Sequence, residues 1–184
     1  IRSTVFDHFC GGVNENDCLR VVDKMYTKGV SSVLDYSVEG KEEEAQFDAA
    51  LNMTLKTIEF AREREAIPFA VFKPTGFGRL ALYEKVGDKA HLTENEQKEW
   101  NRVIERFDIA CKTAFEKDVL LLIDAEESWM QDAADAIVTD MMRKYNKQKA
   151  IVFNTLQMYR WDRLDYLKNL HEQAKVEGFY IGMK

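Results

Sequence analysis

Short apolar runs recur along the chain and are separated by longer stretches with helical periodicity. Most runs are rich in β-branched and aromatic residues, and several are continuous rather than alternating, which is typical of strands buried on both faces. They predict five strands, at residues 32–38, 69–73, 119–124, 150–155 and 179–184. Apolar positions three or four apart predict helices at residues 17–28, 41–66, 130–145 and 161–176, and another after a capping box at Thr93 and Glu96. We expect Asp17 to cap the first helix and Gly178 to end the last.

This alternation predicts an α/β protein with a parallel sheet built from right-handed βαβ units. A nucleotide-binding doubly wound sheet is disfavoured, because Gly76 and Gly78 lack a third glycine and a helix directly behind them. We therefore predict a (β/α)₈ TIM-like barrel of which only about the first four to five βα units are present. Residues 1–30 are expected to form a helical lead-in, and residues 31–184 to carry strands one to five of a single domain. An incomplete barrel would have an open sheet edge through which chains could self-associate.

Composition narrows the possible partners. The formal net charge of −6 and the pI near 5.2 disfavour nonspecific binding to nucleic acid or anionic lipid. No apolar run approaches the ~20 residues that span a bilayer. The three cysteines lack CxxC spacing and the three histidines are scattered, so we expect no metal site built on them.

Polar residues gather where the predicted strands end, which is where barrels of this class build their active sites. Lys73 closes an apolar run and is followed by Pro74 and two glycines, which give the loop a defined shape. A fixed cation there suits a substrate that bears a carboxylate. Asp124 directly follows the third apolar run, and we expect it to pair with Lys73 from the neighbouring strand.

Other strand-end residues are less distinctive. Gln157 follows the fourth strand, and its amide can both donate to and accept from the edge of a heterocycle. Glu126 or Glu127 could simply cap the next helix. Asp35 and Glu39 lie at the end of the first strand, where a solvated rim is the simpler interpretation.

Taken in order, these motifs resemble the proline dehydrogenase family across nearly the whole chain. The matching segments are Val33-Leu-Asp35-Tyr36 with Val38-Glu39, Phe72-Lys73 with Thr75, Ile123-Asp124-Ala125-Glu126, Phe153-Asn154-Thr155 with Gln157 and Tyr159, and Gly182-Met183-Lys184. The resemblance implies a distorted barrel that binds FAD noncovalently and transfers a hydride from the proline ring carbon beside nitrogen to flavin N5. It also implies Δ1-pyrroline-5-carboxylate as product, a membrane quinone as electron acceptor, and a Δ1-pyrroline-5-carboxylate dehydrogenase as a possible partner. The location would be the cytoplasm or the mitochondrial matrix side, peripheral to the inner membrane.

The resemblance also implies roles for individual residues. Lys73 matches the family lysine near the proline carboxylate, and Asp124 matches its partner, so both are expected to bind substrate and to serve catalysis. The residues expected to bind the cofactor are Asp124, Ala125, Gln157 and Lys184. Asp35 and Glu39 match acids at the mouth, with Glu39 at a gate position that pairs with a late arginine. The family's last helix, with its paired arginines, has no counterpart in this chain, so we expect the chain alone to bind neither FAD nor proline well.

Three alternatives stay open. Lys73 could form a Schiff base as in aldolases, with Asp124 or Glu126 handling protons. Asp124 and Glu126 could instead supply oxygen ligands to Mg²⁺. The chain could also be a partial barrel without catalytic activity.

Overall fold

The computed structural model describes residue 6 and residues 10–35 and 42–184 of the chain, so the predicted gate residue Glu39 lies outside the described residues. The elements in chain order are α2 (Glu15–Tyr26), β1 (Val33–Leu34), α3 (Glu44–Arg62), β2 (Phe69–Phe72), the short 3₁₀ turn η2 (Pro74–Gly76), α4 (Leu80–Gly87), α5 (Glu94–Lys117), β3 (Leu120–Ile123), α6 (Ser128–Tyr145), β4 (Val152–Phe153) and α7 (Arg163–Glu177).

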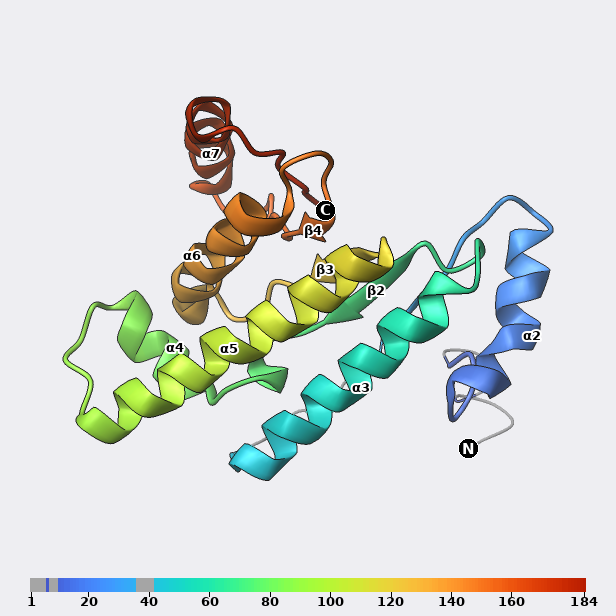
Figure 1. Ribbon diagram of the computed structural model, residues 1–184, viewed down its shortest axis with the longest axis horizontal. Coiled ribbons are helices and arrows are strands. Elements are labelled where there is room, and N and C mark those ends of the chain that lie inside the picture. The colour runs from blue at the N-terminus through green and yellow to red at the C-terminus, as the bar shows by residue number, and fades with distance from the viewer. Residues whose placement is uncertain (1–5, 7–9, 36–41) are drawn as a thin grey trace.

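The four strands form one sheet in which every pair is parallel and the order is β1-β2-β3-β4. Because this order never reverses, right-handed crossovers place successive helices on the same face of the sheet. Accordingly α3 packs on α5 and α5 packs on α6, and Figure 1 shows α3 and α5 lying side by side. A doubly wound sheet would reverse its strand order and carry helices on both faces. The sheet is therefore part of a barrel, as predicted.

The strands are shorter than the sequence suggests at both ends of the sheet. The first is reduced to β1, and part of its predicted range lies outside the described residues. The predicted fifth strand is not a strand: residues 179–184 contribute a single parallel bridge between Asn154 and Met183. A Cβ on Gly182 would lie 2.5 Å from the carbonyl oxygen of Val152, so this close approach requires glycine.

Most predicted helices are confirmed, with shifted ends. Thr93 and Glu96 form the expected capping box of α5, and Gly178 ends α7 in the left-handed conformation with φ of 68°. Asp17 is not the cap of α2. That position belongs to Asn14, whose extended backbone lets its side chain accept from the backbone N–H of Asp17.

The helix α4 has no counterpart among the predicted elements, because its segment was expected to be a loop. It is too short to show a convincing helical period. Its buried side chains are Leu82 and Tyr83. Tyr83 meets Trp100 of α5 edge to face, and the helix packs extensively against α6. Packing rather than local sequence makes this helix.

An aromatic cluster fixes the end of β2. Phe72 stacks on Phe77 with ring centroids 4.4 Å apart and meets Phe107 of α5 edge to face at 5.1 Å. All three rings are buried. Side chains alternate across a strand, so anchoring Phe72 on the helical side directs Lys73 to the opposite side, toward the barrel interior.

Candidate functional site

Lys73 and Asp124 meet at the carboxyl ends of β2 and β3. The two strands are paired in register, with Phe72 opposite Ile123, and the Asp124 N–H donates to the carbonyl of Phe72. The next residue on each strand is therefore a direct neighbour of the other. The Lys73 ammonium lies 3.0 Å from Asp124 Oδ2, which confirms the pairing predicted from sequence.

Two further charged residues join this pair. Asp35 Oδ2, just after β1, lies 3.3 Å from the Lys73 ammonium. Lys184 donates to the other oxygen of Asp124. Asp124 thus holds one lysine on each oxygen, and the four side chains form a site that we call the strand-end charge cluster: Asp35, Lys73, Asp124 and Lys184.

Burial and pairing act in opposite directions on these groups. Burial disfavours the ionised form of Asp124, but hydrogen bonds from Lys184 and Lys73 outweigh it, and the pKa of Asp124 lies below its usual value. Burial likewise acts to lower the pKa of Lys73. The hydrogen bond to Asp124 and the charges of Asp124 and Asp35 raise that pKa above its usual value. Both residues are therefore charged at neutral pH.

Asp124→Asn tests this pairing through pH. A lowered folded-state pKa means that the stability contributed by ionised Asp124 is complete above its unfolded pKa of about 3.9 and is lost as pH falls through the folded value. We expect Asp124→Asn to lower the free energy of unfolding at pH 6, and the gap from the parent chain to shrink from about pH 5 downward. Urea denaturation at several pH values measures the gap.

The matched control is Asp165→Asn, which removes an exposed carboxylate paired with Lys168 on α7. Its effect should be small throughout the titration. A gap for Asp124→Asn that stays constant into the acid range would contradict the lowered pKa.

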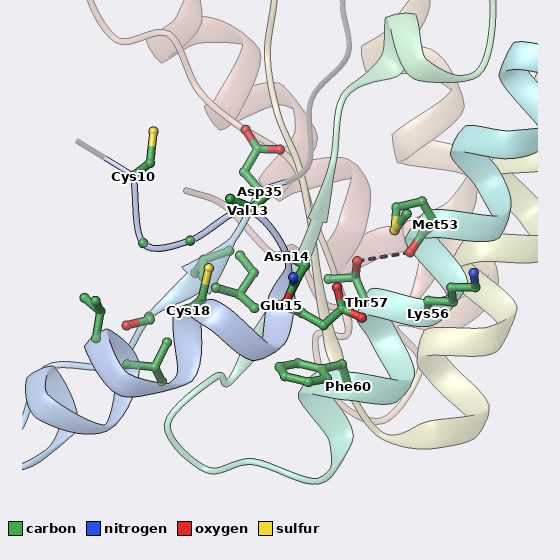
Figure 2. Close-up of a pocket in the computed structure, with 17 residues that line it drawn as sticks. Cys10, Val13, Asn14, Glu15, Cys18, Asp35, Met53, Lys56, Thr57 and Phe60 are labelled. Carbon is green, nitrogen blue, oxygen red and sulfur yellow. Dashed lines mark hydrogen bonds between the residues drawn. The ribbon is translucent and has the colours of Figure 1, made fainter. Parts of the chain in front are cut away.

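A cavity of about 630 Å³ lies between α2, β1 and α3 (Figure 2). Its lining includes Cys18, Val33, Lys56 and Phe60. Of the predicted site residues that the structure describes, only Asp35 contributes to it. The cavity therefore touches the strand-end charge cluster at its rim and does not contain it.

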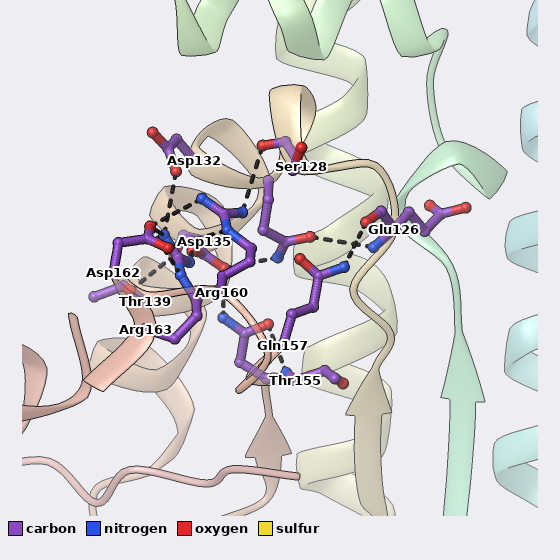
Figure 3. Close-up of polar contacts among 12 residues, drawn as sticks. Glu126, Ser128, Asp132, Asp135, Thr139, Thr155, Gln157, Arg160, Asp162 and Arg163 are labelled. Carbon is purple, nitrogen blue, oxygen red and sulfur yellow. Dashed lines mark hydrogen bonds and ion pairs between the residues drawn. The ribbon is translucent and has the colours of Figure 1, made fainter. Parts of the chain in front are cut away.

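Glu126 is held in place at every polar atom. Its two carboxylate oxygens accept from the Thr75 N–H at 2.8 Å and the Thr75 hydroxyl at 2.7 Å. Its N–H donates to Gln131 at 3.2 Å, and its carbonyl accepts from Gln157 Nε2 at 2.6 Å. Glu126 therefore ties the β2 loop to the β3 and β4 loops. Figure 3 shows its contact with Gln157. It does not cap α6, whose N-cap is Glu127.

A contact from α4 also fixes the loop after β2. Pro74 starts η2, and its carbonyl accepts a 2.8 Å hydrogen bond from the hydroxyl of the fully buried Tyr83. The Lys73 backbone is consequently held between the aromatic cluster and α4. Sequence reasoning missed Tyr83 because it missed the helix that carries it.

The Gln157 amide presents an unsatisfied acceptor. Its Nε2 is occupied by the Glu126 carbonyl, whereas its Oε1 is buried and has no hydrogen-bond partner within the described part of the chain. A buried acceptor without a donor is costly, so this atom suits a ligand that donates a hydrogen bond. Ala125 lies on the same loop as Glu126, next to Asp124.

Sequence reasoning thus located Asp35, Lys73, Asp124, Gln157 and Lys184, which the structure places at one edge of the sheet. It missed a set of buried polar residues behind that edge. The missed residues are Gln131, Asp135 and Arg163, whereas Asn154 was named only as part of a matching motif. A signal existed, because Gln131, Asp135 and Thr139 follow one another at spacings of four along α6.

The described residues lack two features, a ready metal-binding cluster and a membrane-spanning helix. Residues 6, 10–35 and 42–184 contain no group of three or more His, Cys, Asp or Glu side chains placed to hold a metal ion. No helix among those residues combines the length and apolar character needed to cross a membrane.

Comparison with known proteins gives a consistent result. A family profile described as proline dehydrogenase matches residues 18–184. The carbapenem antibiotics biosynthesis protein CarD of Pectobacterium carotovorum is 34% identical over 182 residues, covering 99% of this chain and 48% of CarD. Human mitochondrial proline dehydrogenase 1 is 36% identical over 95 residues, covering 52% of this chain and 16% of the human protein. The chain spans less than half the length of either relative.

Solved structures agree on the fold. Proline utilization A (PutA) from Bdellovibrio bacteriovorus superposes with a TM-score of 0.74 at 15% identity, covering 91% of this chain and 18% of that protein. PutA from Corynebacterium freiburgense gives a TM-score of 0.71 at 14% identity, covering 99% of this chain and 18% of that protein. The matching profile, the relatives and the barrel geometry lead to one conclusion: the chain belongs to the proline dehydrogenase family.

Proposed function

We propose that the protein takes part in the oxidation of L-proline to Δ1-pyrroline-5-carboxylate, with FAD as cofactor. The observation that carries this proposal is the strand-end charge cluster, in which Lys73 and Lys184 are held on the two oxygens of Asp124. An ammonium can donate three hydrogen bonds. Each lysine is thus fixed in position and keeps donor capacity for a further acceptor, such as a carboxylate.

The roles follow from the charges. Lys73 would bind the proline carboxylate, and Asp124 would keep Lys73 charged and aimed through their 3.0 Å contact. Asp35, also bound to Lys73, would line the mouth of the site. Lys73 and Asp124 need not move a proton during the reaction, since their pairing keeps both ionised at neutral pH.

One observation in particular supports a flavin at this site. Gln157 Oε1 is buried and has no partner in the described residues, so it suits a donor on the edge of a heterocycle. Asp124, Ala125, Gln157 and Lys184 are the residues that would hold the cofactor. When bound, FAD supplies the acceptor for the hydride that proline loses.

The wider setting is also a proposal. Electrons would pass to a membrane quinone, and the product would pass to a Δ1-pyrroline-5-carboxylate dehydrogenase, as a first step of proline breakdown on the cytoplasmic or mitochondrial matrix side. Residues 1–184 would form one part of a single barrel domain. Because the chain covers 48% of CarD and 16% of the human protein, we propose the activity for a protein of full family length and not for these residues alone.

The structure weakens the Schiff-base alternative. A lysine that attacks a carbonyl must lose its proton, so such residues have a lowered pKa. The pKa of Lys73 is raised, because the hydrogen bond and charge of Asp124, with the charge of Asp35, outweigh the effect of burial. Lys73 is better suited to bind an anion than to act as a nucleophile.

A visible spectrum of the full-length protein tests the proposed function. The expected result is a flavin spectrum that bleaches on anaerobic addition of L-proline and does not bleach with D-proline. A protein that stays colourless and takes up no FAD would contradict the proposal. Borohydride trapping of a carbonyl compound on Lys73 would then favour the Schiff-base enzyme.

A further inference from the structure

Asp135 is a buried carboxylate in the middle of α6, with 6% of its side chain exposed. Its Oδ1 accepts from Gln131 Nε2 at 2.8 Å and from Asn154 Nδ2 at 2.9 Å. Its Oδ2 accepts from Arg163 at 2.6 Å. Asp135 therefore joins α6 to the end of β4 and to α7 (Figure 3). A charge this deeply buried is stable only because each oxygen has a donor.

Gln131 extends this network toward the site. It lies one helical turn before Asp135 and is 1% exposed. Its Nε2 is bound to Asp135, so its Oε1 faces the other way and accepts from the Glu126 N–H at 3.2 Å. The contact with Asp135 therefore fixes the Gln131 amide so that its oxygen, and not its NH₂ group, points at Glu126.

The carbonyl of Glu126 in turn orients the side-chain amide of Gln157. With its N–H held by Gln131 and its carboxylate held by Thr75, the Glu126 carbonyl has a fixed direction and accepts from Gln157 Nε2. That bond occupies the NH₂ group of Gln157. The other polar atom of the amide, the buried Oε1, is left without a hydrogen-bond partner among the described residues. Without the relay, the amide could rotate and present its NH₂ group instead.

The end of β4 is fixed by the same carboxylate. Asn154 binds Asp135 through Nδ2, and its Oδ1 accepts from the Thr155 N–H at 2.8 Å. Thr155 in turn donates its hydroxyl to the carbonyl of Ile123 on β3. Asp135 therefore acts on Gln157 in two ways. Through Asn154 it holds the backbone before Gln157, and through Gln131 it holds Glu126, whose carbonyl binds the Gln157 amide.

We propose that Gln131 and Asp135 are positioning residues for the cofactor: the relay Asp135–Gln131–Glu126 orients Gln157 so that its oxygen accepts a hydrogen bond from the heterocycle. This inference rests on the proposed function for the identity of the ligand. The relay itself consists of contacts within the chain and can be tested without any ligand.

Gln131→Met is the test variant, because it keeps the side-chain length and removes both hydrogen bonds. The matched control is Asn146→Leu. Asn146 is another fully buried amide, bonded to the backbone of Ile151, Val152 and Tyr180 near the amino end of β4. Both variants lose a buried hydrogen-bonded amide, but only the first touches the relay.

Two measurements separate the variants. Hydrogen exchange measures how well the backbone N–H of Glu126 is protected. We expect faster exchange of this N–H in Gln131→Met and not in Asn146→Leu. FAD titration of the full-length protein reads the cofactor, and we expect the dissociation constant to rise about tenfold in Gln131→Met alone. Asn146→Leu should lose at least as much thermal stability as Gln131→Met, because Asn146 makes four side-chain hydrogen bonds and Gln131 makes two. If Gln131→Met does not fold, Gln131→Asn gives the same comparison with an amide too short to bridge Asp135 and Glu126.

The outcomes are distinguishable. Unchanged exchange at Glu126, or an unchanged dissociation constant in a protein that binds FAD, would overturn the inference. A rise in the dissociation constant of equal size in Asn146→Leu would reduce the relay to general stability and would also overturn it. A parent protein that binds no FAD would contradict the proposed function, while the exchange result would still decide whether Gln131 holds Glu126.

Discussion

Lys73→Met lowers kcat/KM for L-proline about 10²-fold in the full-length protein, because it removes one partner of a charge-assisted contact worth about 3 kcal/mol. The loss appears mainly in KM, since the carboxylate is bound in the ground state and in the transition state alike. Folding persists, because Asp124 keeps its second partner, Lys184. Steady-state kinetics with L-proline measure the effect.

Two controls make this prediction specific. Lys117→Met removes the lysine of an ion pair with Glu59 on the outer helices and should leave the kinetics unchanged. L-prolinamide lacks the carboxylate, so its inhibition constant should be nearly the same for the parent protein and Lys73→Met. An equal loss of affinity for proline and prolinamide would show that Lys73 does not bind the carboxylate.

Arg163→Met destabilises the fold by about 3–5 kcal/mol, the typical cost of breaking a buried ion pair by removing one partner. The Arg163 and Asp135 side chains are 5% and 6% exposed. After the substitution Asp135 keeps two amide donors, Gln131 and Asn154, but has lost its closest cation. Urea denaturation measures the change in the free energy of unfolding.

An exposed pair on the same helix serves as control. Lys168 and Asp165 are 65% and 77% exposed, so Lys168→Met should change the free energy of unfolding by no more than about 0.5 kcal/mol. If Arg163→Met cost as little, the contact between Arg163 and Asp135 would contribute no more to stability than an exposed ion pair does. The large burial of the pair makes the opposite result the expected one.

The sequence was most informative where local pattern and tertiary environment agree. The runs Phe69–Phe72 and Leu120–Ile123 are buried on both faces and are continuous in apolar residues, so they could be predicted as parallel strands. Their parallel order places the residues that follow them side by side. The contact between Lys73 and Asp124 was predictable for that reason.

Other features depend on contacts between distant parts of the chain. The helix α4 exists because Leu82 and Tyr83 are buried against other elements, which no eight-residue window reveals. Lys184 reaches Asp124 across 60 positions of sequence, and only the family resemblance pointed to it. The relay through Gln131 was missed because helix faces were assigned from apolar positions, whereas buried polar residues follow the same spacing.

The packing of α4 on α6 has a consequence for the order of folding. Each strand pairs only with its neighbours in the chain, so successive βα units can assemble as the chain leaves the ribosome. The unit that contains β2 is the exception, because α4 (Leu80–Gly87) buries its apolar side against Ser128–Tyr145, a helix made about forty residues later. Until that helix emerges, the face of α4 that packs on α6 stays exposed to water and to chaperones, whereas Tyr83 can already contact Trp100 of α5 and the carbonyl of Pro74. The packing around α4 is therefore complete only after α6 has been synthesised.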